Sequence, residues 1–298
     1  AHRRGLEVLV GISDYPYLQM PGNCLTTERN CYMQVRDSYR KNLERGFLVK
    51  DPSSGLRTYH PALQTISLMN EPDLKFLPSE RPGSFLKPIL SAFDAVLQLE
   101  EELQVAGPMP NLTVTFSFAV CPACPDHGAS PAVGQMSVLR DAMRDPAAFG
   151  YNTTRDLWGA YVRRFENSVN TANPAGSFNS LFLHLYDRVF PGVPVFVGEY
   201  HAPQVRNQVA DLKEVIALAG NESNNLKGIS FFEFQARYDK GGSELAFGLF
   251  GLGNRSLGRF ALGPKDKSET YHAWCLAPLA APAYVVSCPR VATGVEYV

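Results

Sequence analysis

Short runs of apolar residues separated by longer segments recur along most of this chain. The runs are rich in Val, Ile, Leu and Phe with little polar alternation, which is typical of strands buried on both faces. Because they alternate with helix-like intervals, the pattern predicts an α/β fold with a parallel sheet. The six runs are Leu6–Ile12, Leu63–Met69, Leu112–Val120, Leu181–Tyr186, Val193–Val197 and Ile229–Phe234.

Three intervals have the periodicity of amphipathic helices. The clearest is Ser84–Ala106, which begins at a plausible N-cap serine and ends before a Gly-Pro pair. Asn152–Ala172 and Gln204–Ala219 show the same pattern. The chain therefore has the order of repeated strand–helix units, without an internal sequence repeat.

We predict that residues 1–298 form one domain. Residues 1–235 would hold the strand–helix units. Residues 236–298 are richer in Gly, Pro and Ala, which favours a long closing loop, a last helix and a C-terminal tail.

Charge and hydropathy exclude two classes of partner. The net charge is −1 with no basic block, so a nucleic-acid partner is not expected. No apolar run is long enough to cross a bilayer, so a membrane span is not expected. We expect the protein to be a monomer.

Cysteines and glycosylation sequons point to an exported protein, secreted or in the cell wall. Six cysteines fall into close pairs, which predicts local disulfides, although fifteen pairings are formally open. The pairs are Cys24/Cys31, Cys121/Cys124 and Cys275/Cys288. Four Asn-x-Ser/Thr sequons lie at Asn111, Asn152, Asn221 and Asn254. The Cys-x-x-Cys pair lacks a second ligand pair, so we expect no metal there.

Two of the apolar runs end abruptly in a glutamate, Glu71 and Glu199. In a closed (β/α) barrel the carboxyl ends of the strands converge on one face, so these carboxyls can meet across the barrel mouth. Glycosidic cleavage needs such a pair, because one protonated carboxyl donates to the leaving oxygen while one carboxylate attacks or activates water. The two strand ends therefore predict a glycosidase site.

The Asn-Glu-Pro motif at residues 70–72, followed much later by a strand ending in Glu199, resembles the clan A glycoside hydrolases, including β-glucanase-like members. Members are (β/α)8 barrels whose acid/base ends the fourth strand and whose nucleophile ends the seventh. Two apolar runs lie between the glutamates, as the fifth and sixth strands would. Over residues 5–235 the resemblance implies Glu71 as the acid/base and Glu199 as the nucleophile of a retaining reaction.

The resemblance also implies substrate-binding side chains. Asn70 would bind the sugar 2-hydroxyl, and His184 and Tyr186 would end the sixth strand as its His-x-Tyr. Phe232 and Phe234 end the eighth strand, where members commonly place a tryptophan as the floor of the sugar site. Asn70 could instead cap a turn, and His184 and Tyr186 could instead be core residues.

Five further residues stay open between a place in the site and a structural role. They are Asp14, Tyr15, His60, His201 and Glu233.

Counting back from the fourth strand makes Leu6–Ile12 the third. The fold class that follows is a (β/α)8 TIM barrel with strands three to eight in this chain. Closure requires two more strand–helix units, about 60 residues. Either further chain precedes Ala1, which we expect, or residues 236–298 substitute for the two units.

We interpret the chain as a secreted retaining glycoside hydrolase of a β-linked polysaccharide, a β-glucan or related wall polymer, without metal or organic cofactor. A transglycosylase would use the same residues with a sugar acceptor. A non-catalytic glycan-binding or wall protein on a degenerate barrel is the alternative of another class. The missing strands favour that alternative, and the pair of glutamates opposes it.

Overall fold

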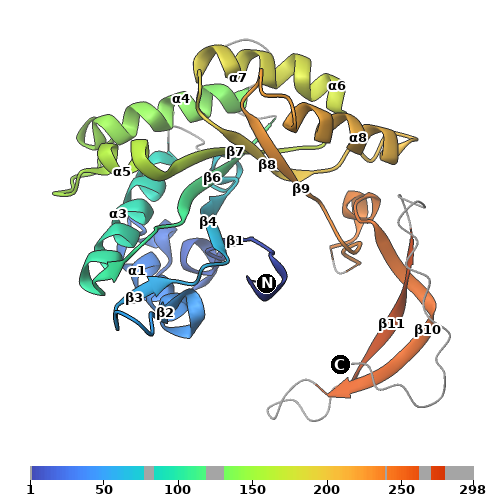
Figure 1. Ribbon diagram of the computed structural model, residues 1–298, viewed down its shortest axis with the longest axis horizontal. Helices are drawn as coiled ribbons and strands as arrows, with labels where there is room; N and C mark the ends of the chain where they lie inside the picture. Colours follow the sequence, from blue (N-terminus) through green and yellow to red (C-terminus); the bar gives the residue numbers. More distant parts are fainter. Residues whose placement is uncertain (1, 77–83, 119–130, 239, 262–269, 279–298) are drawn as a thin grey trace.

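A six-stranded parallel sheet is the centre of the molecule (Figure 1). The computed structural model describes residues 2–76, 84–118, 131–238, 240–261 and 270–278. Every pairing within the sheet is parallel, and the spatial order of the strands follows the chain. The strands are β1 (Val8–Gly11), β4 (Leu63–Asn70), β6 (Asn111–Ser117), β7 (Phe165–Thr171), β8 (Val195–Tyr200) and β9 (Leu226–Phe231). The predicted α/β fold is confirmed as a parallel half-barrel.

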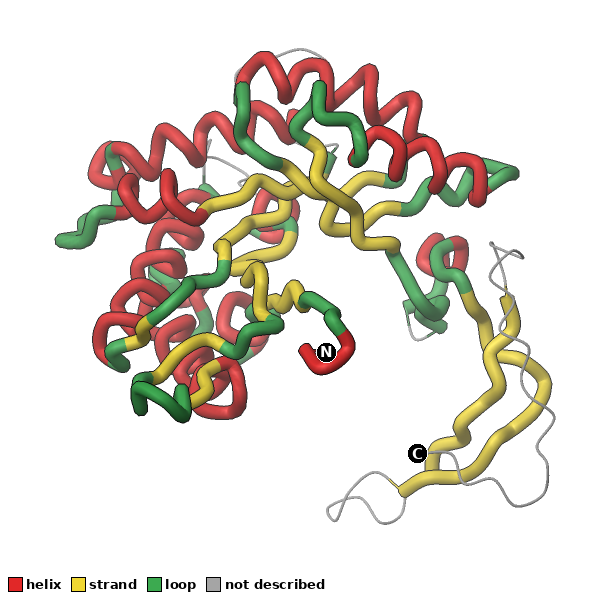
Figure 2. The backbone as a smooth tube through the Cα atoms, in the orientation of Figure 1, coloured by secondary structure: helices red, strands yellow, loops and turns green. Residues whose placement is uncertain are grey.

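Helices connect the strands and cover the convex face of the curved sheet (Figure 2). The longer helices bury apolar side chains against the sheet; on α3, Ile89, Phe93 and Val96 have no exposed surface. The helices are α1 (Tyr32–Asn42), α2 (Pro72–Lys75), α3 (Leu86–Glu102), α4 (Pro131–Arg144), α5 (Leu157–Arg164), α6 (Ala175–Phe178), α7 (His184–Val189) and α8 (Gln208–Ala219). This arrangement leaves the carboxyl ends of all six strands on one edge.

The prediction for the sixth strand was wrong. Leu181–Tyr186 lies in a helical segment that continues into α7, and the sheet position is taken by β7. All of β7 falls within the predicted Asn152–Ala172 helix, of which only α5 is helical in the structure. Two strands still separate β4 from β8, so the expected count between the glutamates is confirmed.

Aromatic spacing explains the helix at this position. Phe178, Phe182, Tyr186 and Phe190 recur every four residues, and their rings stack in succession at centroid distances of 5.1, 5.4 and 5.1 Å. That period places them on one helix face. Strand β7 was not predicted because polar residues are buried on both of its faces, Asn167 toward the helices and Ser168 and Asn170 on the opposite face.

Two smaller sheets were not predicted. Strands β2 (Leu48–Lys50), β3 (Arg57–Tyr59) and β5 (Val105–Ala106) form one of them. In the segment expected to be a closing loop with a last helix, β10 (Phe250–Ala261) and β11 (Thr270–Pro278) pair as an antiparallel hairpin. Figure 1 shows this hairpin extending away from the parallel sheet.

One predicted disulfide is present between Cys24 and Cys31, which are buried before and at the start of α1. Cys275 is also disulfide-bonded. Cys121, Cys124 and Cys288 lie outside the described residues, so the other two pairings stay predictions.

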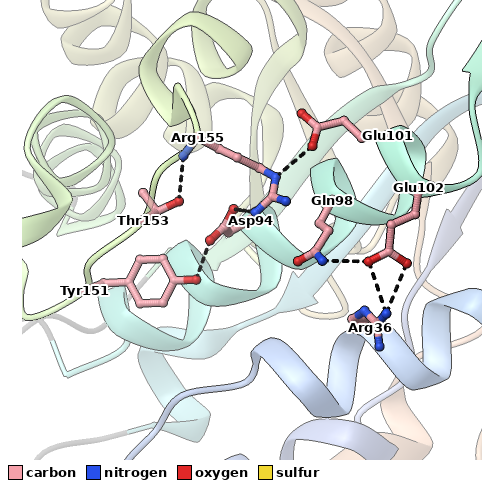
Figure 3. Close-up of polar contacts among 8 residues, drawn as sticks. All are labelled: Arg36, Asp94, Gln98, Glu101, Glu102, Tyr151, Thr153 and Arg155. Carbon is pink, nitrogen blue, oxygen red and sulfur yellow. Dashed lines mark hydrogen bonds and ion pairs between the residues drawn. The ribbon is translucent and has the colours of Figure 1, made fainter.

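Polar side chains of α3 tie this helix to its neighbours (Figure 3). Asp94 accepts hydrogen bonds from the Tyr151 hydroxyl at 2.6 Å and from Arg155 at 3.2 Å. Glu102 accepts from Arg36 of α1 at 3.0 Å. The loop before α5 is therefore fixed against the helical layer. Among the described residues, no helix is long and apolar enough to span a membrane.

Candidate active site

A cavity of about 640 Å³ opens at the carboxyl ends of the strands. Ligand sites commonly occupy this position in α/β barrels. The described lining residues are Asp14, Asn70, Glu71, Leu74, Lys75, Ser117, Phe118, Asn170, Thr171, Ala172, Asn173, Glu199, His201, Phe232, Lys240, Glu244 and Phe247. The two predicted catalytic glutamates thus face one cavity.

Glu71 lies one residue beyond β4. Its backbone N–H donates to the carbonyl of Thr115 on β6 at 2.7 Å, so it continues the pairing of the sheet. Its φ of 49° and ψ of 53° are left-handed, and Pro72 then begins α2. Left-handed backbone is unfavourable for a residue with a Cβ, and such strain clusters at functional sites. This turn places Glu71 in the wall of the cavity.

Glu199 lies near the end of β8 and is held by Asn70. The Asn70 amide Nδ2 donates to Glu199 Oε1 at 3.0 Å, although 129 residues separate the two. The next residue, Tyr200, is buried and donates to Asp211 of α8 at 2.6 Å. The Tyr200 hydrogen bond fixes β8 against α8. The Asn70 hydrogen bond orients the Glu199 carboxylate on the cavity side.

Opposing influences set the protonation of Glu199. Burial raises the pKa of its carboxyl, and the negative charge of Glu71 raises it further. The hydrogen bond from Asn70 and the positive charges of Lys75 and Lys240 act in the other direction. The pKa of Glu199 is raised overall from the ordinary glutamate value. Ionisation of Glu199 is therefore favoured only by Asn70, Lys75 and Lys240.

Both lysines among the described lining residues are paired with acids. Lys75 of α2 contacts Asp14, which follows β1, at 2.8 Å. Lys240 contacts Glu244 at 3.1 Å and lies 6.0 Å from the centroid of the Phe232 ring. Each lysine is therefore compensated by a neighbouring acid, and Glu71 and Glu199 belong to neither pair.

Aromatic side chains form another part of the wall. Phe232, just beyond β9, packs edge-on against Phe247 at a centroid distance of 5.4 Å. The His201 ring contacts Phe247 at 5.3 Å, and its Nδ1 donates to the Phe232 carbonyl at 2.7 Å. Burial lowers the pKa of His201, which favours the neutral ring. Phe232 thus lies in the wall of the cavity, whereas Phe234 is 63% exposed and packs against Phe250.

His184 and Tyr186 are absent from the described lining of the cavity. Both lie in α7, where His184 is exposed and Tyr186 is fully buried. The Tyr186 hydroxyl accepts a hydrogen bond from Asn167 at 2.9 Å. The core interpretation of Tyr186 fits this contact, and the proposed His-x-Tyr strand end does not exist.

Sequence reasoning missed the contributions of Asn170 and both lysines. Asn170 lies one residue before the end of β7, is paired in register with Glu199, and donates to Asn70 Oδ1 at 3.1 Å. The feature of the sequence that could have indicated Asn170 is the polar segment at residues 166–171, which has the length of a strand. Of the residues left open, Asp14 and His201 line the cavity, whereas Tyr15, His60 and Glu233 are absent from its described lining. The described residues contain no cluster of three potential metal ligands.

No protein-family model matches the chain, and no curated protein sequence matches it. Solved structures with a similar arrangement include a family 1 β-glucosidase from Thermotoga maritima, at 12% identity and a TM-score of 0.49, covering 85% of this chain and 70% of that one. A β-glucosidase from Exiguobacterium marinum has 11% identity and a TM-score of 0.47, covering 82% and 73%. A Bacteroides uniformis β-glucuronidase has 14% identity and a TM-score of 0.41; the alignment covers 78% of this chain and only 24% of that one.

Proposed function

We propose that this chain is a retaining β-glycosidase that acts on a neutral polysaccharide. The observation that carries the proposal is the shared cavity of Glu71 and Glu199, with Asn70 bound to the second of them. Two carboxyls from the ends of separate barrel strands are the groups that glycosidic cleavage requires.

The two glutamates take different roles. Glu199 attacks the anomeric carbon as the bond to the leaving oxygen breaks, and Glu71 donates a proton to that oxygen. Water then attacks the glycosyl ester; Glu71 takes a proton from this water, and Glu199 leaves as the carboxylate. Because Asn70 already occupies Oε1 of Glu199, the attacking atom is Oε2.

The wall of the cavity favours a neutral sugar. Lys75 and Lys240 are already paired with Asp14 and Glu244, so neither offers an uncompensated charge to a uronic acid. The Phe232 ring supplies an apolar face of the kind that packs against a sugar ring. A β-glucan or a related wall polymer fits this combination.

The first experiment is a screen of product release from neutral β-1,3- and β-1,4-glucans and from polyuronides. Release from a neutral glucan, with the β-anomer formed first in the proton NMR spectrum, is the expected result. A 2-deoxy-2-fluoro glycosyl inactivator of matching specificity should label Glu199. An inverted product, or a label on Glu233, would contradict the proposal.

Product analysis at high substrate concentration also separates hydrolysis from transfer. Longer oligosaccharides would indicate a transglycosylase using the same residues. Binding of glucan without any turnover would instead support a non-catalytic glycan-binding protein.

A further inference from the structure

A chain of amide hydrogen bonds connects three strands at the cavity. Asn170 Nδ2 donates to Asn70 Oδ1 at 3.1 Å, and Asn70 Nδ2 donates to Glu199 Oε1 at 3.0 Å. Asn70 comes from β4, Asn170 from β7 and Glu199 from β8. Asn170 is 6% exposed, so water competes little for this chain.

The carboxylate determines the direction of both amides. An ionised carboxylate only accepts hydrogen bonds, so Asn70 must present its NH2 group to Glu199. Its carbonyl oxygen therefore faces Asn170, which must in turn present its own NH2 group. A reversed Asn70 amide would place oxygen against oxygen at Glu199.

We propose that Asn170 is a positioning residue that fixes the Asn70 amide, so that Asn70 holds Oε1 of the nucleophile and leaves Oε2 free to attack. This inference rests on the proposed function, because it assigns Glu199 as the nucleophile. Asn170 does not itself contact the reacting atoms. Its effect passes through the orientation of Asn70.

Two substitutions of Asn170 act differently on these hydrogen bonds. Asn170→Ala removes the donor and frees Asn70 to rotate. Asn170→Asp keeps the shape but opposes Asn70 Oδ1 with a carboxylate, which favours the reversed amide. We expect kcat to fall roughly 10-fold for alanine and more for ionised aspartate, with little change in KM.

The Asn70→Ala background provides the discriminating measurement. If Asn170 acts through Asn70, Asn170→Ala should change kcat less than about 2-fold in that background, because coupled residues are non-additive. Multiplicative losses in the double variant would overturn the proposal. Asn173 is a matched control, since it also lines the cavity but donates to Thr171. Asn173→Ala should show no such coupling.

A titration of Glu199 separates failure of this inference from failure of the proposed function. With carboxyl-13C glutamate, the Glu199 signal is identified by its loss in Glu199→Gln. Asn170→Ala and Asn170→Asp should both raise the pKa of Glu199, because the Asn70 hydrogen bond that lowers it is weakened. This measurement requires no turnover. An unchanged titration in folded variants would overturn the positioning role, whatever the activity screen gives.

Discussion

The Asp73 carboxylate accepts hydrogen bonds from both the backbone N–H and the hydroxyl of Ser117, at 3.1 and 2.8 Å. These bonds join α2 to the end of β6 beside the cavity. Burial raises the pKa of Asp73 to about 6, against the hydrogen bonds from Ser117, which lower it. The negative charge of Glu71 also contributes to the rise.

This raised pKa predicts a pH-dependent stability. Between about pH 4 and pH 6 the folded chain holds a proton on Asp73 that the unfolded chain has released. Its contribution is therefore full below pH 4 and lost as the pH rises through 6. Asp73→Asn should raise the free energy of unfolding at pH 7 relative to pH 4, by roughly 1–3 kcal/mol more than in the parent.

Urea unfolding at the two pH values measures this difference. Asp37→Asn, at an exposed position on α1, is the control and should follow the parent. Equal pH dependence in Asp73→Asn and the parent would show that Asp73 titrates normally.

Alanine substitution of the two glutamates should affect turnover in different ways. Glu199→Ala should abolish turnover and regain it with azide, giving a glycosyl azide of inverted configuration. Glu71→Ala should lose roughly 10²–10⁴-fold on natural substrates but spare glycosides with good leaving groups, which need no proton. Product stereochemistry by NMR distinguishes them, since azide rescue of Glu71→Ala should retain configuration.

Glu214→Ala is the matched control, because this glutamate is exposed on α8. It should retain parental activity. Azide products of the same configuration from both catalytic variants would refute the assignment of roles.

Gly198 provides the space that Asn170 occupies. A Cβ at Gly198 would lie 2.8 Å from Thr115 Cγ2, 2.9 Å from Asn170 Oδ1 and 3.0 Å from Ser168 Oγ. Gly198→Ala should therefore displace these side chains, costing about 1–3 kcal/mol of stability and lowering kcat. On β9, Gly228→Ala meets nothing within 4 Å and is the control. Thermal unfolding and initial rates measure both effects, and equal behaviour of the two variants would be the contrary outcome.

Glycan occupancy tests which of the four predicted sequons are accessible in the folded chain. Asn152, Asn221 and Asn254 are exposed, whereas Asn111 is half-buried and its amide donates to Glu166. After expression through a eukaryotic secretory pathway, we expect glycans at the three exposed sites and little at Asn111. Peptide mass spectrometry measures each occupancy. Full occupancy at Asn111 with the exposed sites empty would contradict this order.

Local sequence determined most of the sheet and the position of both glutamates. Strands buried on both faces need continuous apolar residues, so β4, β6 and β8 were readable within a few residues of their bounds. Glu71 and Glu199 could be identified because each lies two residues beyond the last residue of an apolar run. The parallel order then followed from the alternation of strands with helices.

Tertiary structure decided which polar residues act together. Strand β7 has buried polar residues on both faces, so its local pattern resembles a loop or helix; its pairing with β6 and β8 makes it a strand. Conversely, Leu181–Tyr186 is apolar enough for a strand, but the four-residue aromatic spacing around Tyr186 packs only as a helix. The bonds from Asn170 to Asn70 and from Asn70 to Glu199 cross 100 and 129 residues of chain. No local pattern encodes such contacts, because they arise only when the curvature of the sheet brings the strand ends together.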